Sequence, residues 1–173
     1  MKNLKSFLSI SFFLLSLSSY SQLSKGNLMV GGLFSTSIGN GVRNFNLNPS
    51  CGYFVKNNAV LGGALDFAYS RYSNGNYDTY MAISAMGRYF FTSKEVNSPK
   101  APIFVQARLG FSTASYSNAI GFGAIGLGFD YFLTSSVALE GMVGTNIDNT
   151  GYANVYAMLG FQIFLPSSIY SKK

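Results

Sequence analysis

Apolar and polar positions alternate along most of the chain. Within residues 59–72, the large apolar residues Leu61, Leu65 and Phe67 share one phase, while small residues and one carboxylate, Asp66, share the other. Because successive side chains of a β-strand point to opposite faces, this pattern predicts a strand with one strongly apolar face and one small, polar face.

Eight segments show this alternation, and short polar connections rich in Asn, Gly and Ser separate most of them. The segments are 26–36, 44–55, 59–72, 78–91, 102–114, 119–133, 137–145 and 152–165. No segment beyond residue 21 has helical periodicity, and no Pro/Ser-rich linker marks a second domain. The pattern therefore predicts an all-β fold with eight antiparallel strands in up-and-down order.

Charged side chains are absent from the middle of every apolar row. The mid-strand charges all fall on the smaller, more polar row, and these are Asp66, Arg88, Arg108, Asp130 and Glu140. A soluble sheet would cover that face with long charged side chains. A transmembrane barrel instead turns its apolar row to lipid and its polar row to the lumen, and closure leaves no unpaired sheet edge in the membrane. We therefore predict an eight-stranded antiparallel transmembrane β-barrel.

The five inward charges form the candidate site. Folding segments 119–133 and 137–145 about Ser135 places Asp130 opposite Glu140. Two facing carboxylates in a low-dielectric interior repel each other and need cations, and Arg88 and Arg108 are the inward ones. We predict one ionic layer of Asp66, Arg88, Arg108, Asp130 and Glu140, nearer the end with the tight turns. Its role is structural, and a proton or ion path through it is the alternative.

Aromatic residues collect near the predicted strand ends. They include Tyr53, Phe54, Tyr69, Tyr72, Tyr77, Tyr80, Tyr89, Phe91, Phe129, Tyr131 and Tyr152. Amphipathic rings are favoured at lipid headgroup level, so we predict that these form two girdles around the barrel. Plain strand propensity is the alternative explanation.

Composition excludes several other classes of protein. Only 10% of the 173 residues are charged, whereas soluble proteins have roughly a quarter. No run after residue 21 approaches the roughly 20 apolar residues of a spanning helix. Residues 1–21 resemble a signal peptide, with Lys2 and Lys5 before an apolar stretch and a Ser-Tyr-Ser cleavage site. An N-terminal anchor is the alternative, and residues 22–173 form the predicted barrel domain.

The residue inventory argues against catalysis and cofactors. The chain has no His and a single Cys, Cys51, which excludes His-dependent nucleophilic catalysis, His metal sites, a disulfide framework and a multi-cysteine metal site. The GxGxxG spacing of Gly121, Gly123 and Gly126 lies inside a predicted strand, so it does not indicate a nucleotide site. The lysines are scattered, so the net charge of +6 does not indicate nucleic-acid binding. We predict no enzymatic activity, no metal and no cofactor.

Several stretches resemble a known family. FNLNPSCGYFVKNNAVLGGALDF (45–67), MGRYFF (86–91), FDYFLTSSVALEG (129–141) and LGFQIFL (159–165) are similar to small outer-membrane β-barrel proteins of Bacteroidota. The resemblance implies a porin-like, OmpA/OmpX-type barrel inserted by the outer-membrane assembly machinery. Gly160, Ile163 and an end at Phe164 or Leu165 are similar to the assembly signal of such barrels, although residues 166–173 extend beyond it.

These observations predict a monomeric integral protein of the cell outer membrane, surrounded by outer-membrane lipid. Both termini and the turns at 56–58, 92–101 and 134–136 should face the periplasm, and the connections 37–43, 73–77, 115–118 and 146–151 should face outside. The expected role is structural, with weak surface contacts through short loops and no pore. The alternative is a soluble exported barrel that binds a small apolar ligand inside.

Overall fold

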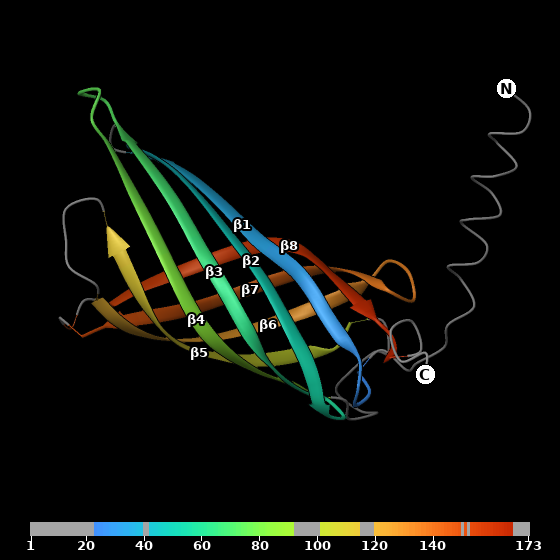
Figure 1. Cartoon of the computed structure of the whole chain (residues 1–173). Coiled ribbons are helices and arrows are strands. Elements are labelled where there is room, and N and C mark those ends of the chain that lie inside the picture. Colours follow the sequence, from blue (N-terminus) through green and yellow to red (C-terminus); the bar gives the residue numbers. More distant parts are fainter. Residues whose placement is uncertain are drawn as a thin grey trace, which may run out of the picture.

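The computed structural model describes residues 23–39, 42–91, 101–114, 120–149, 151 and 153–167, which form a closed barrel (Figure 1). The strands are β1 (Leu28–Gly39), β2 (Val42–Lys56), β3 (Ala59–Tyr72), β4 (Tyr77–Phe91), β5 (Ile103–Ala114), β6 (Ile120–Phe132), β7 (Val137–Asp148) and β8 (Ala153–Leu165). Each pairs antiparallel with its neighbours in sequence, and β8 pairs with β1. The predicted fold class is confirmed. No helix among the described residues is long and apolar enough to cross a membrane.

The strand positions agree closely with the sequence pattern, except at the end away from the tight turns. There the ladder of β1 and β2 continues to Gly39 and Val42, and β7 continues to Asp148. Most of the predicted connection 37–43 and half of the predicted connection 146–151 are therefore strand. Polar residues extend these hairpins because the backbone ladder needs no apolar side chains. The predicted signal peptide (1–21), most of the connection 92–101, the connection 115–118 and the end of the tail lie outside the described residues.

The large apolar rows face outward and the small, polar rows face the lumen. Leu61 is 58% exposed, Ile83 63% and Leu109 72%, whereas Arg88 and Asp130 on the opposite rows are buried. The alternation of residues predicts this arrangement, because the interior of an eight-stranded barrel is too narrow to hold a large side chain at every inward position.

One part of the lumen differs from the prediction of small inward residues. At the end with the tight turns, the fully buried rings of Phe54, Phe90, Phe104 and Phe164 fill the barrel, with Phe132 against Phe164 at a centroid distance of 5.0 Å. Phe54, assigned to a girdle from the sequence, is therefore a lumen residue. Its neighbour Tyr53 takes the outward position, so aromatic character alone did not reveal the phase.

Inward glycines let neighbouring strands approach closely. A Cβ atom on Gly62 would overlap the carbonyl oxygen of Cys51 on β2, and one on Gly160 would overlap that of Gly32 on β1. The adjacent outward Gly63 has room, because its Cβ would lie 3.4 Å from the nearest atom, the carbonyl oxygen of Ser84.

Gly62→Ala should therefore destabilise the barrel by about 1–3 kcal/mol, the usual cost of overpacking. Urea titration of the folded protein, followed by gel mobility of unboiled samples, measures this change. Gly63→Ala is the matched control and should leave the midpoint nearly unchanged. Equal midpoints for both variants would contradict the close approach of β2 and β3.

Candidate functional site: the charged lumen and its vestibule

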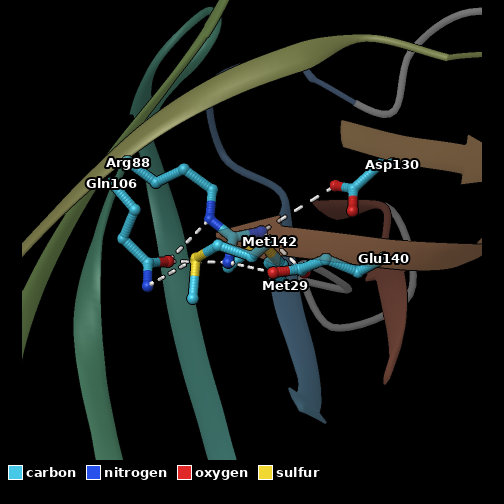
Figure 2. Close-up of polar contacts among 6 residues, drawn as sticks. All are labelled: Met29, Arg88, Gln106, Asp130, Glu140 and Met142. Atoms are coloured by element: carbon cyan, nitrogen blue, oxygen red, sulfur yellow. Dashed lines mark hydrogen bonds and ion pairs between the residues drawn. The ribbon is translucent and has the colours of Figure 1, made fainter. Parts of the chain in front are cut away.

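Arg88 on β4 is the centre of a buried polar group (Figure 2). Its guanidinium lies against Phe90 and Phe104 of the phenylalanine layer, which consists of Phe54, Phe90, Phe104 and Phe164. Its Nη1 and Nη2 donate to the two carboxylate oxygens of Glu140 on β7 at 2.9 and 2.8 Å. Its Nε and Nη2 donate to Oε1 of Gln106 at 2.9 and 2.6 Å. The guanidinium carbon lies 3.9 Å from the ring centroid of Phe104. The two parallel hydrogen bonds to Glu140 form a bidentate arginine–carboxylate pair, which is among the strong hydrogen-bonded contacts in proteins.

Asp130 on β6 faces the same guanidinium. The strand register places it directly opposite Glu140, and its Oδ2 lies 3.8 Å from Nη1 of Arg88. Neither carboxylate oxygen of Asp130 has a hydrogen-bond partner among the described residues. One guanidinium thus faces two carboxylates, so Glu140 is the fully paired acid and Asp130 is the weakly held one.

Arg108 on β5 belongs to a second group, farther from the tight turns. Its Nη1 donates to both oxygens of Asp66 at 3.0 and 3.1 Å, and Nδ2 of Asn48 donates to Oδ1 of Asp66 at 2.7 Å. The structure thus brings all five predicted residues into the lumen, but in two groups and not in one layer.

The strand register explains this division. On β4 the partner of Asp66 is Ala82, whereas Arg88 lies opposite Val60. The pairing of β3 with β4 therefore places Asp66 and Arg88 six residues apart along the barrel wall, at different levels of the lumen.

A polar vestibule opens beyond the second group. It has a volume of about 590 Å³, and its lining includes Asp66 and Arg108 with Asn44, Asn46, Asn146 and Tyr156. Nε of Arg108 and Oδ1 of Asn146 are buried without a hydrogen-bond partner in the described part of the chain. Sequence reasoning passed over this feature, although Asn at alternate positions 44, 46 and 48 was a visible signal of a polar lumen face.

Tyr80, assigned to a girdle from the sequence, also lines the vestibule.

Among the described residues, no three His, Cys, Asp or Glu side chains gather in a way that would hold a metal ion. The charged groups of the lumen therefore contact one another and neutral polar side chains, and these contacts connect strands across the barrel.

Comparison with known proteins finds likeness in structure. No family model matches the chain, and no curated protein matches it. The crystal structure of Neisserial surface protein A (NspA) is similar at a TM-score of 0.56 and 20% identity, over 79% of this chain and 94% of that one. The outer membrane protein OprG from Pseudomonas aeruginosa is similar at 0.56 and 10% identity, over 86% of this chain and 100% of that one. At these identities the likeness establishes the fold.

The two facing carboxylates should respond differently to neutralisation. Glu140→Gln removes one oxygen of the bidentate pair with Arg88 and should lower the free energy of unfolding by about 3–5 kcal/mol, as for a broken buried pair. Asp130→Asn should lower it by a smaller amount, because Asp130 contacts Arg88 only through the longer ion pair of 3.8 Å. Urea unfolding in detergent micelles measures both.

The two variants control for each other, since they remove one negative charge each at opposite positions of one strand pair. A larger loss for Asp130→Asn than for Glu140→Gln would contradict the assignment of Glu140 as the principal partner of Arg88.

Proposed function

We propose that this protein is an integral outer-membrane β-barrel with a structural role in the envelope and a closed lumen. The observation that carries the proposal is the reversal of ordinary burial. Large apolar side chains cover the outside of the barrel, and the arginines and carboxylates of the mid-strand positions lie inside. Such a surface is stable in contact with lipid and unstable in contact with water.

The apolar surface has the height of a membrane. Outward positions on β8 run from Val155 to Leu165, and each of them is apolar. At about 3.3 Å per residue and a strand tilt of about 40°, this stretch spans about 25 Å, the height of the lipid-facing band of such barrels.

Tyrosines border this band at both ends. Tyr53, Tyr89 and Tyr131 are exposed near the end with the tight turns, and Tyr69 and Tyr77 are exposed near the other end. Tyrosine is favoured at the headgroup level, so these residues support the two predicted girdles. The likeness to the outer membrane protein OprG supports the same membrane.

The closed lumen supports a structural role over that of a pore. The phenylalanine layer and the Arg88 group occupy the barrel section beneath the vestibule, and their side chains are buried. A soluble barrel with an apolar ligand inside would need Leu61 and Phe67 in the interior and Asp66 outside, which is the reverse of their positions. The absence of His continues to argue against catalysis.

Leu65→Arg should impair membrane insertion, because a cation on the lipid-facing surface near the midplane costs about 2–4 kcal/mol. Ala68→Arg on the inward row of the same strand is the control, since Ala68 faces the vestibule. The measurements are the amount in the outer-membrane fraction and the mobility of unboiled against boiled samples. Wild type and Ala68→Arg should fractionate with the membrane and shift on boiling.

The opposite result would overturn the membrane assignment. Recovery of the wild type in the soluble fraction, without a shift on boiling, would mean that the apolar surface is covered by something other than lipid.

The closed lumen predicts no ion conductance. Wild-type protein reconstituted in a planar lipid bilayer should leave the current at the level of the empty bilayer, while a general porin in the same lipid gives stepwise increases. Regular conductance steps from the wild type would contradict the proposed absence of a pore.

A further inference from the structure

The seam between β1 and β8 is paired over only part of its length. Its ladder runs from Leu28 opposite Leu165 to Phe34 opposite Leu159 and ends there. Continuing the same register would pair Ser35 with Met158 and Thr36 with Ala157. Both strands extend through this region, because β1 continues to Gly39 and β8 begins at Ala153. The two edges therefore separate before either strand has ended, and their ribbons diverge in Figure 1.

An apolar groove lies on the outer side of this opening. Its volume is about 800 Å³, and its lining includes Phe34, Leu127, Val143, Ala157 and Leu159. The polar vestibule lies on the lumen side. Ser35 of β1 and Met158 of β8 line both spaces, so the groove and the vestibule meet at the edges of the opening.

The two spaces differ sharply in chemistry. Groove side chains are aliphatic or aromatic apart from Ser35 and Thr36 at its edge. The vestibule presents amides and hydroxyls around the ion pair of Arg108 and Asp66, together with the carboxylate of Asp148. Buried Nε of Arg108 and Oδ1 of Asn146 have no partner among the described residues. Exposed strand edges at membrane depth also need hydrogen-bond partners, because lipid tails supply none.

We propose that the opening between β1 and β8 is a binding site for a single-chain amphiphile with an uncharged, hydroxyl-rich head group. The chain occupies the groove, and the head group enters the vestibule between the two strand edges. Hydroxyls act as both donors and acceptors, so such a head group matches the mixed donors and acceptors of the vestibule lining, which includes Arg108 and Asn146, and the unpaired strand edges. The groove volume is in the range of sites for one drug-sized ligand, which favours one chain over a two-chain lipid. The proposal rests on insertion of the barrel in a membrane.

Disulfide trapping tests the opening. In a Cys51→Ser background, the pair Thr36→Cys and Ala157→Cys occupies positions that would face each other if the ladder continued. Val30→Cys and Ile163→Cys form the matched control, because Val30 is paired with Ile163 lower in the same seam and on the same face. With a membrane-permeant oxidant, the control should cross-link quickly and the upper pair at least about tenfold more slowly, since disulfides require Cα atoms within about 7 Å.

Two outcomes of this experiment would overturn the proposal. Cross-linking of the upper pair as fast as the lower pair, within one chain, would mean that the seam is closed. A cross-linked dimer from the upper pair would mean that a second copy, and not an amphiphile, occupies the edge.

Fluorescence quenching tests the ligand, because the chain has no Trp. Leu159→Trp places a reporter in the groove, and Leu65→Trp places one on β3, away from it. Each variant is inserted in phosphatidylcholine vesicles that contain either a monoacylglycerol or a phosphatidylcholine, brominated at the same chain position. The measured quantity is the quenching by the brominated monoacylglycerol divided by the quenching by the brominated phosphatidylcholine. This ratio corrects for the depth of the Trp side chain in the membrane. It should be close to one at position 65 and severalfold higher at position 159.

Further measurements separate the possible results. Unbrominated monoacylglycerol should lower the ratio at position 159, and Asn146→Leu should lower it by removing a partner of the head group. A ratio close to one at both positions overturns the binding site. If the protein still shifts on boiling and fractionates with the outer membrane, the proposed membrane barrel stands without it.

Discussion

Closure of only eight strands is the constraint on which the rest of this structure depends. An eight-stranded barrel is just wide enough for its inward side chains to fill, so no inward position is independent of those across the lumen. The lumen is accordingly stacked in sections: a phenylalanine layer, the Arg88 group, the Arg108 group and the vestibule. Buried polar atoms without a hydrogen-bond partner among the described residues occur at both levels of the lumen. Asp130 and Gln162 carry them near the closed end, and Arg108 and Asn146 carry them at the vestibule.

The Arg88 group connects strands that the backbone ladder does not join. Arg88 on β4 bonds to Glu140 on β7, three strands away, and the pair lies among fully buried rings. Burying such a pair costs desolvation energy, and an apolar replacement of the same volume is often equally stable. We interpret the pair as a determinant of register, because a shift of either strand by one residue would turn one charge outward.

The sequence allowed the strands, their faces and the pairing of Asp130 with Glu140 to be predicted, since all three follow from alternation and from one tight turn. The division of the charges into two groups already follows from the β3–β4 hairpin, which pairs Asp66 with Ala82, six residues from Arg88. Which acid each arginine contacts across the lumen depends on the strand register accumulated around the barrel, and the local pattern does not contain that register. The phenylalanine layer was missed because aromatic residues occupy both phases in Tyr53-Phe54 and Tyr89-Phe90, so apolar character did not distinguish inside from outside.

The β1–β8 seam is the part of the fold least determined by local sequence. In all pairs of neighbouring strands except β1–β8, the two strands follow each other in the chain. The segment that connects them limits how far they can separate at that end. The seam joins the two ends of the barrel domain, so only its own ladder and side chains hold it. Its lower part is supported by Met29 and Phe164 in the lumen core, whereas its upper part carries Ser35 and Thr36 and borders the vestibule. Opening therefore costs least where the lumen is polar and hollow, which is where a head group would find unpaired donors and acceptors.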